Sequence, residues 1–257
     1  MINVVKIGGN VIDNPDALEA FLRNFAALPG RKILVHGGGK EATRLSESMG
    51  MKATMIDGRR VTDRPTLDVV TMVYAGLINK RIVALLQKFG CDAAGLTGAD
   101  GNVIPAVRRP ARPVDYGFVG DIDPAKINDS FIGTLLEAGV TPVFCAICHD
   151  EAGSLLNCNA DSVASAVAVG ASRIAPVRLT YCFEKPGVMT DVNDDDSVIP
   201  LITPATFETL KSSGVVAQGM IPKLQNALRS NEQGVSEVRI CHASALAGSG
   251  GTIVRHE

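Results

Sequence analysis

Short apolar runs rich in β-branched residues alternate with amphipathic stretches along this 257-residue chain. Residues 3–7 and 32–35 have the composition of buried strands, and residues 16–27 and 40–49 carry apolar side chains at helical spacing. Strands that alternate with helices build a parallel sheet, because each helix returns the chain to the same end of the sheet. We therefore predict an α/β fold, a three-layer αβα sandwich around a mainly parallel central sheet.

The remainder of the chain continues this alternation with two distinctive segments. Residues 66–89 predict one long helix that ends at Gly90 and offers a candidate dimer surface. Residues 102–121 contain prolines and glycines that interrupt short alternating runs, which indicates β-hairpins that form a lid over the sheet. Further helices are expected at residues 123–138, at 160–169, near Pro204 and near Pro222, and further strands at residues 141–146, 237–241 and 252–255.

Charge and hydropathy exclude several classes of function. The net charge of −2 gives no overall attraction to nucleic acid or to an anionic membrane. The first ten residues lack the apolar core of a signal peptide, and no uninterrupted apolar run approaches the roughly 18 residues of a membrane span. We expect a cytoplasmic protein with no nucleic-acid or membrane partner.

The six cysteines predict buried thiols rather than a disulfide scaffold. Cys145, Cys148 and His149 match the C-x-x-C-H pattern of haem attachment, and Cys158 nearby would allow a partial zinc site. No second metal pair follows, and the flanking residues have the composition of a buried strand. We favour thiols at a strand end and predict no metal-binding residues. The acidic residues 194–196 indicate a solvated turn.

Three glycine-containing turns lie where strands are expected to run into helices. They are Lys6-Ile7-Gly8-Gly9, His36-Gly37-Gly38-Gly39 and Gly219-Met220-Ile221-Pro222-Lys223. Backbone N–H groups at such turns bind anions, although glycine also serves simply to permit a tight turn. Two of the turns carry a lysine, whose compact charge suits a transferring phosphoryl group. His36 is more typical of a structural hydrogen-bonding residue than of an acid or base.

Familiar nucleotide-binding motifs fit poorly. Lys40 is followed by Glu41 instead of Ser or Thr, so a P-loop of the usual form is excluded. Gly37 and Gly39 followed by Ala42 do resemble a dinucleotide fingerprint, but about 20 residues further on the chain has a predicted turn. A Rossmann oxidoreductase therefore remains a weaker alternative.

A set of motifs along the chain resembles the N-acetylglutamate kinases of the amino-acid kinase family, which phosphorylate N-acetylglutamate in arginine biosynthesis. The motifs are the three glycine turns together with Gly58-Arg59-Arg60-Val61-Thr62, Gly98-Ala99-Asp100-Gly101, Leu156-Asn157-Cys158-Asn159-Ala160-Asp161 and Gly251-Thr252. The resemblance implies an acyl-amino-acid lobe at residues 1–172 and an ATP lobe at residues 173–257 that share one sheet. It also implies ATP with Mg²⁺ held mainly by the nucleotide, and an N-acylglutamate substrate.

The same resemblance implies roles for individual residues. Lys6 and Lys223 would flank the transferring phosphoryl group, and Asp161 would hold both lysines. Arg60 would bind a substrate carboxylate, and Asn157 the region of the α-carboxylate or amide. Backbone groups of Gly8, Gly9, Gly37 and Gly38 would surround the phosphoryl oxygens, and Thr180, Gly219 and Met220 would contact the nucleotide. Helix capping is the structural alternative for Asn157 and Asp161.

The expected chemistry needs no general base. A glutamate side chain, with a usual pKa of about 4.3, is already a carboxylate at neutral pH. Catalysis then reduces to alignment and charge neutralisation.

The sequence departs from the family pattern in two places. Tyr181 stands where the family has an aspartate, near its nucleotide contacts, and Phe144 and Cys148 replace smaller residues near the substrate strand. The acyl group therefore stays open between acetyl and a longer group such as succinyl. Arginines of the predicted lid, at positions 108, 109 and 112, would bind such a longer group.

The chain begins directly at its first predicted strand, without the N-terminal helix associated with arginine-inhibited hexamers of the family. We therefore expect a homodimer that arginine does not inhibit. Glutamate, aspartate or carbamate kinases, and a regulatory amino-acid-binding protein of the same fold, are the alternatives. The regulator would be expected to lack Lys6 or Lys223, and both are present.

Overall fold

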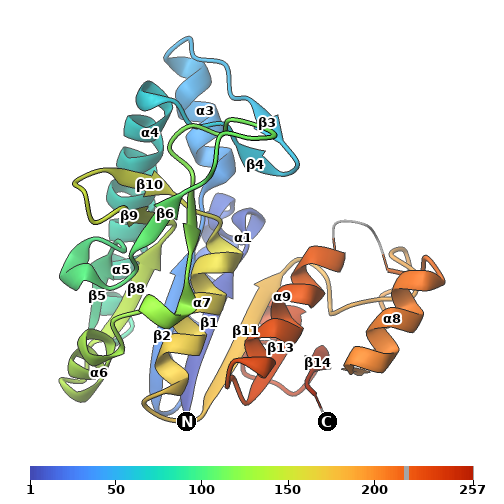
Figure 1. The fold of residues 1–257 in the computed structure, drawn as a ribbon. Coiled ribbons are helices and arrows are strands. Elements are labelled where there is room, and N and C mark those ends of the chain that lie inside the picture. The colour runs from blue at the N-terminus through green and yellow to red at the C-terminus, as the bar shows by residue number, and fades with distance from the viewer. Residues whose placement is uncertain (217–219, 257) are drawn as a thin grey trace.

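The computed structural model describes residues 1–216 and 220–256, and its centre is a mainly parallel β-sheet (Figure 1). Within this part of the chain the sheet has eight strands in the order β12-β14-β13-β11-β1-β2-β8-β5. All neighbouring strands are parallel except β13 and β14. The strands are β1 (Ile2–Ile7), β2 (Arg31–His36), β5 (Ala93–Leu96), β8 (Thr141–Cys145), β11 (Val177–Phe183), β12 (Leu201–Ile202), β13 (Glu237–His242) and β14 (Thr252–Val254). The predicted fold class is confirmed.

Helices cover both faces of the sheet, because successive residues of the central strands point to opposite sides. In β1, Ile2 and Val4 belong to one apolar cluster and Val5 and Ile7 to the other. The first cluster packs under α6 (Asp129–Glu137), α7 (Ala160–Ser172), α8 (Pro204–Ser212) and α9 (Ile221–Glu232). The second packs under α1 (Gly9–Asp13), α2 (Pro15–Ala26), α4 (Arg64–Thr71), the π-helix η1 (Met72–Ile78) and α5 (Asn79–Lys88), with α3 (Gly39–Ser48) beside them.

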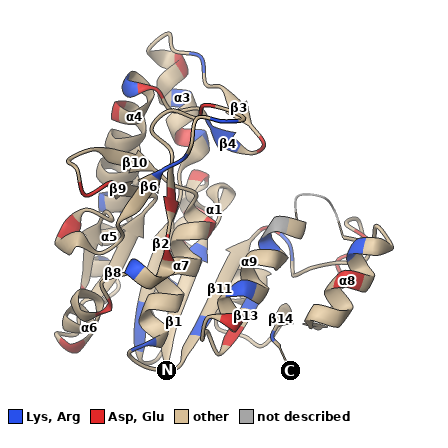
Figure 2. Ribbon diagram, viewed as in Figure 1, with Lys and Arg blue, Asp and Glu red and all other residues tan. Residues whose placement is uncertain are grey.

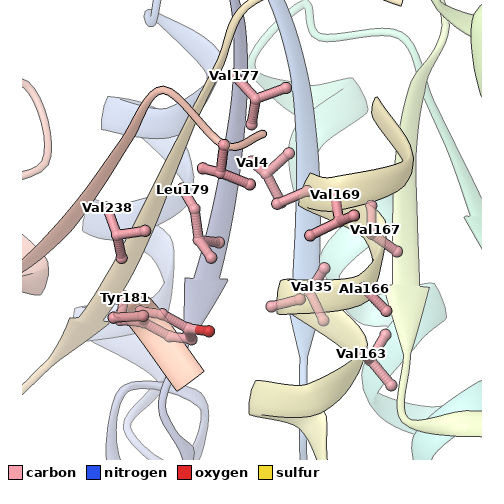
Figure 3. Close-up of a cluster of buried hydrophobic side chains, with 14 of the residues drawn as sticks. Val4, Val35, Val163, Ala166, Val167, Val169, Val177, Leu179, Tyr181 and Val238 are labelled. Atoms are coloured by element: carbon pink, nitrogen blue, oxygen red, sulfur yellow. The ribbon is translucent and has the colours of Figure 1, made fainter. Parts of the chain in front are cut away.

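The small residues of α7 let it lie directly on the middle of the sheet. Figure 3 shows Val163, Ala166 and Val167 of this helix in one cluster of buried side chains with Val4 and Val35, and with Leu179 and Tyr181 of β11. All these side chains are almost fully buried. This packing fixes the start of α7 near the carboxyl ends of β1 and β2, where polar side chains then gather.

The long predicted helix is present as α4, η1 and α5, which together run from Arg64 to Lys88. By length and composition this is the one helix in the described part of the chain that would reach across a membrane, with a mean hydropathy of 1.6 over 18 residues. It packs against α2, α3 and β5, and 44% of that window is buried. A core helix has the same properties, so this finding is weak evidence for a membrane span.

Three small antiparallel hairpins lie at one end of the central sheet. They are β3 (Met55–Ile56) with β4 (Arg59–Arg60), β6 (Ala106–Arg108) with β7 (Gly120–Ile122), and β9 (Ile147–His149) with β10 (Leu155–Asn157). Single bridges between Thr62 and Gly117, and between Val119 and Asn157, tie the hairpins together. The segment predicted to hold several hairpins, residues 102–121, contributes to one hairpin, β6 with β7.

Some elements differ from the sequence-based prediction. The strand β5 was not predicted, because its sequence Ala-Ala-Gly-Leu lacks the β-branched residues that are typical of a strand. The predicted helix at residues 123–138 is divided into the 3₁₀-helix η3 (Pro124–Lys126) and the α-helix α6. The division occurs because the Asn128 side chain accepts a hydrogen bond from the backbone N–H of Phe131 and so caps the start of α6. The remaining 3₁₀-helices are η2 (Asp100–Asn102) and η4 (Ala243–Ala245). Residues 194–196 are exposed, as expected of a solvated turn.

Candidate active site

Two of the glycine turns meet at the carboxyl ends of the neighbouring strands β1 and β2. Helix α1 begins at Gly9 and α3 begins at Gly39, so the amino ends of both helices lie beside each other at this end of the sheet. Gly38 has a φ of 155°, and a Cβ atom there would lie 2.3 Å from Cδ1 of Ile78. Only glycine suits that position. The Gly8 N–H donates to the carbonyl of Cys182, so it is already used within the sheet.

Lys6 and Asp161 form an ion pair over this end of the sheet. The Lys6 Nζ atom lies 2.7 Å from Oδ1 of Asp161, and both side chains are largely buried. Burial is the largest influence on the pKa of Asp161 and raises it, but the charge and hydrogen bond of Lys6, with the charge of Lys223, hold that pKa below its ordinary value. The aspartate is therefore a carboxylate at neutral pH that orients Lys6.

Lys223 approaches the same place from the first turn of α9. Its Nζ atom lies 4.8 Å from the centre of the Phe183 ring, a cation–π contact at the end of β11. Phe183 in turn lies against Gly8, since a Cβ atom at Gly8 would be 3.5 Å from Cβ of Phe183. Both lysines therefore lie close to the β1 turn, although the direct partner of Asp161 is Lys6.

A cavity of about 180 Å³ opens beside the second glycine turn. Arg60 lines it with only 6% of its surface exposed. Its Nη2 atom donates to the carbonyl of Gly39 and to Oγ1 of Thr43, both at 2.8 Å. Its Nε and Nη1 atoms are buried and have no hydrogen-bond partner within the described residues. A buried guanidinium with free donors at a cavity is arranged to receive an anion, because an unpaired buried charge is costly.

Asn157 lies in the same cavity wall, at the end of β10. Its Nδ2 atom donates to Oγ1 of Thr62 at 3.0 Å, which fixes the side-chain amide. The cap of α7 is Asn159, whose Oδ1 atom accepts from the backbone N–H groups of Asp161 and Ser162. Neither Asn157 nor Asp161 is therefore used in helix capping, and both side chains remain available for a ligand or for a lysine.

His36 is fully buried beneath the second glycine turn. Its Nδ1 atom lies 2.8 Å from the carbonyl of Gly37, and its Nε2 atom lies 3.0 Å from Nδ2 of Asn79. Burial lowers the pKa of the imidazole to about 4, so the ring is neutral at physiological pH. It holds the turn in place, which confirms its interpretation as a structural residue.

A second cavity, of about 500 Å³, lies beside the start of α9. Its walls come from residues 187–192 and 214–216 together with Lys185 and Met220. Most of these groups are apolar or backbone, which suits the flat ring of a nucleotide base. Met220 lines this cavity, and its contact with a nucleotide stays a prediction, whereas Gly219 lies outside the described residues.

Thr180 does not reach either cavity. It pairs in register with Val5 and shares that residue's side of the sheet, opposite to the side that carries Lys6 and α7. Only 3% of its surface is exposed. Tyr181 is likewise buried, and its hydroxyl donates to the carbonyl of Asp161 at 3.3 Å. The replacement of the family aspartate by Tyr181 therefore adds a packing contact to α7.

The chain is similar in sequence to proteins of one known family. The amino acid kinase family matches residues 1–242. The chain belongs to this family. It is 53% identical over 244 residues to the acetylglutamate kinase of Cytophaga hutchinsonii, an alignment that covers 95% of this chain and 92% of that protein. The acetylglutamate kinase of Phocaeicola vulgatus is 48% identical over 254 residues, which cover 99% and 98% of the two chains. The predicted resemblance is confirmed.

Solved structures show the amino acid kinase fold in relatives more distant than these. A protein from Streptococcus mutans is 28% identical, with a TM-score of 0.81 and coverage of 100% of this chain and 99% of that one. A carbamate kinase from Giardia is 16% identical, with a TM-score of 0.70 and coverage of 100% and 99%. At such identity the second likeness shows the fold alone.

Several lining residues of this kinase were not foreseen from the sequence. Tyr74 lies on the buried side of the long helix and reaches the cavity that Arg60 lines. Tyr74 was not identified as a site residue from the sequence, because the whole helix was interpreted as a candidate dimer surface. Arg59 and Met55 come from the short β3–β4 hairpin, which is too short for a periodic pattern. Lys185 and the loop at residues 187–192 follow the unusual stretch after β11.

The side chains near the glycine turns are compatible with a magnesium ion that is bound mainly by the phosphates of a nucleotide. The described residues contain no group of three or more histidine, cysteine or acidic side chains placed to hold a metal. Asp161, the carboxylate at the β1 turn, is paired with Lys6. Magnesium commonly keeps water and phosphate oxygens as ligands, so this kinase family member does not require a protein cage for it. All six cysteines are free and buried.

Proposed function

We propose that the protein transfers the γ-phosphoryl group of ATP to the side-chain carboxylate of N-acetylglutamate, as a step of arginine biosynthesis. The observation that carries the proposal is the joint placement of two sites. The Lys6–Asp161 ion pair and the cavity of Arg60 and Asn157 lie next to each other, with the glycine turns of β1 and β2 between them. Proteins named acetylglutamate kinase share 40% to 53% of this chain's sequence over nearly its full length.

The substrate's α-carboxylate is assigned to Arg60. The Nε and Nη1 atoms have no partner within the described residues, so each is free to donate to a carboxylate oxygen. The amide of Asn157 is held by Thr62 and is assigned to the acylamino end of the substrate. With both ends fixed in this way, the side-chain carboxylate is directed toward the glycine turns.

The phosphoryl group is assigned to the space between Lys6 and Lys223. Charge accumulates on its equatorial oxygens as it passes from ATP to the carboxylate, and two ammonium groups neutralise that charge. The backbone N–H groups at the start of α1 and α3, from Gly9 and Gly38 onward, are proposed as further donors. Gly8 contributes through its shape, because its own N–H is already bonded to Cys182.

No residue needs to remove a proton from the acceptor. The side-chain carboxylate of N-acetylglutamate is ionised at neutral pH, so alignment and charge neutralisation supply the catalysis. Bound with ATP, Mg²⁺ would neutralise phosphate charge. Asp161 contributes by directing Lys6 at the reacting oxygens.

The nucleotide is assigned to the cavity of residues 187–192, 214–216 and Met220. Its position beside the first turn of α9 would direct the phosphates of a bound ATP toward Lys223. This assignment gives residues 173–257 the nucleotide and residues 1–172 the acylated amino acid, as the sequence predicted. The central sheet runs through both parts, with β1 and β11 as neighbours.

Acetyl is the acyl group that the cavity favours. Phe144 and Cys148 are fully buried and do not line the cavity, so their larger side chains leave its size unchanged. Arg109 lies 2.6 Å from Asp121, and the Nε atom of Arg108 donates to the carbonyl of Gly117. Arg108 and Arg109 therefore each have a partner within the protein, and none of the three lid arginines, Arg112 included, lines the cavity, which argues against their use for a longer, charged acyl group.

We further propose a cytoplasmic homodimer. The long helix exposes Met72 and Leu77, with 53% and 45% of their surfaces accessible, which makes its outer side the natural contact between two copies. Sedimentation of the chain and of the Met72→Asp variant would test this, because a charge at that contact would give a monomer. An unchanged sedimentation coefficient in the variant would place the contact elsewhere.

The decisive assay for the proposed activity measures ADP release with MgATP and a series of acceptors. The series contains N-acetylglutamate, N-succinylglutamate, glutamate, aspartate and carbamate. We expect turnover with N-acetylglutamate and at least tenfold less with the others. Turnover confined to free amino acids or carbamate would assign another reaction of the family, and absence of turnover with every acceptor would favour a regulatory binding protein.

A further inference from the structure

A polar groove separate from both proposed substrate cavities runs between α7 and α9. Its volume is about 290 Å³, and it is lined by side chains of both helices and by the β7 strand and Arg59. It shares only Arg59 with the cavity of Arg60. Ser165 and Ser230 join the two helices along it, with their Oγ atoms 2.5 Å apart. The groove therefore spans the part of the chain assigned to the acylated amino acid and the part assigned to ATP.

Two arginines give this groove a positive charge that the protein does not balance. Arg59 enters from the β3–β4 hairpin, and Arg229 enters from α9. Within residues 1–216 and 220–256, neither guanidinium has an ion-pair or side-chain hydrogen-bond partner. The one acidic side chain of the lining, Asp121, lies 2.6 Å from Arg109 and is neutralised by it. Figure 2 shows basic positions on β4, above α7, and on α9, beside α7.

The remaining polar groups of the lining are neutral and able to donate hydrogen bonds. They are Ser162 of α7, Asn226 of α9, and Gln233, which directly follows α9. Paired guanidinium groups with neutral donors between them match a small molecule with two anionic groups, because each fork binds the oxygens of one carboxylate or phosphoryl group. A neutral or cationic ligand would leave both charges unpaired.

From these observations we propose that the α7–α9 groove is a second anion site, which takes a small metabolite with two carboxylate or phosphoryl groups. One anionic group binds Arg59 and the other binds Arg229, so the ligand links the two parts of the protein across α7. Apart from Arg59, which also lines the cavity of Arg60, the site lies outside the proposed catalytic cleft. Its existence therefore does not depend on the proposed reaction.

The test is calorimetric titration of the full chain with pyrophosphate and, separately, with tricarballylate, in magnesium-free buffer. Wild type, Arg229→Glu and Arg255→Glu are compared, where Arg255 is an exposed arginine far along the chain from the groove lining. Binding of either probe at the lysines of the cleft is common to all three proteins. The difference between the two variants therefore reports the groove.

We expect Arg229→Glu to lose one binding event, or to weaken it at least tenfold, while Arg255→Glu behaves as wild type. Loss for pyrophosphate alone identifies a phosphoryl ligand, and loss for tricarballylate alone identifies a carboxylate ligand. Equal isotherms for the three proteins, or no binding of either probe to wild type at 10 mM, would overturn the proposal. Unfolding curves of the variants exclude a loss caused by misfolding.

Discussion

Replacement of Arg60 by Gln removes the cation from the substrate-side cavity and leaves a polar side chain of similar reach. In the wild type, the Nε and Nη1 atoms are buried without a partner, while Nη2 is held by Gly39 and Thr43. An arriving carboxylate would therefore meet a positioned, desolvated guanidinium with free N–H donors. Loss of one member of such a buried charged pair costs about 2–5 kcal/mol.

The expected effect is confined to one substrate. Taking a loss of about 3 kcal/mol, the KM for N-acetylglutamate rises roughly 150-fold, because each 1.4 kcal/mol is a factor of ten. The KM for ATP changes less than about threefold, since the nucleotide cavity shares no residue with the cavity of Arg60. Thr43→Val, which removes only one of the contacts that hold the guanidinium, should raise the KM for N-acetylglutamate by roughly tenfold or less.

Initial rates measured by coupled ADP release, with each substrate varied in turn, provide the values. Arg64→Gln is the matched control, because Arg64 is an exposed arginine of the neighbouring helix. An unchanged KM for N-acetylglutamate in Arg60→Gln, or equal increases in both KM values, would refute the assignment of Arg60 to the substrate carboxylate.

Further predictions concern the residues around the glycine turns. Burial lowers the pKa of His36 from 6.5 to about 4, so as the pH falls the imidazole takes up a proton in the unfolded state before it does so in the folded state. The free energy of unfolding should therefore fall by about 3 kcal/mol between pH 6.5 and pH 4. Urea unfolding should show this loss in wild type and in His256→Gln but not in His36→Gln. The pKa of Asp161 lies below 3.8, so its stabilising charge is present above that pH and is lost below it. Asp161→Asn should lower kcat roughly 10- to 100-fold and should be less stable than wild type at pH 7, a difference that shrinks below pH 3.8. A constant difference down to pH 2 would contradict this reasoning. Gly38→Ala should destabilise the protein by about 1–3 kcal/mol in thermal unfolding, whereas Gly37→Ala, with 3.5 Å to the nearest side chain, should cost less than about 1 kcal/mol. Equal losses in the two variants would be inconsistent with this geometry.

Much of the fold was predictable because its strands and helices carry strong periodic patterns. The strands at residues 3–7 and 32–35 and the helix at residues 160–169 are present with small changes at their ends. Elements with weaker sequence patterns were not predicted. The strand Ala93–Leu96 consists of small residues, and the hairpin at Met55–Ile56 and Arg59–Arg60 is too short to show alternation. Pairing with a neighbouring strand, which is a tertiary effect, creates both.

The candidate site was predictable where a motif both folds the turn and carries the charge. Lys6, Arg60, Asn157 and Asp161 come from such motifs, and the structure brings all four to one end of the sheet. Thr180 shows the limit of this reasoning. The sequence places it near the end of a strand, but only the register with Val5 reveals that it faces the opposite side of the sheet.

Nucleotide contacts were less predictable for a different reason. The cavity beside α9 is built from a loop and from the residues before α9, whose main contribution is backbone and shape. Tyr181, in contrast, is a departure from the family motif that was identified from the sequence near the nucleotide contacts, but its side chain is buried under α7. A substitution that changes a motif therefore need not change the site.

The central claim is that a carboxylate of N-acetylglutamate receives the phosphoryl group. Phosphorus NMR of a reaction with MgATP and N-acetylglutamate tests it most directly, with hydroxylamine added at the end to convert an acyl phosphate to a hydroxamate. We expect a new acyl-phosphate resonance that grows with ADP and disappears on addition of hydroxylamine. Appearance of ADP and inorganic phosphate without that resonance, and without any hydroxamate, would contradict the account.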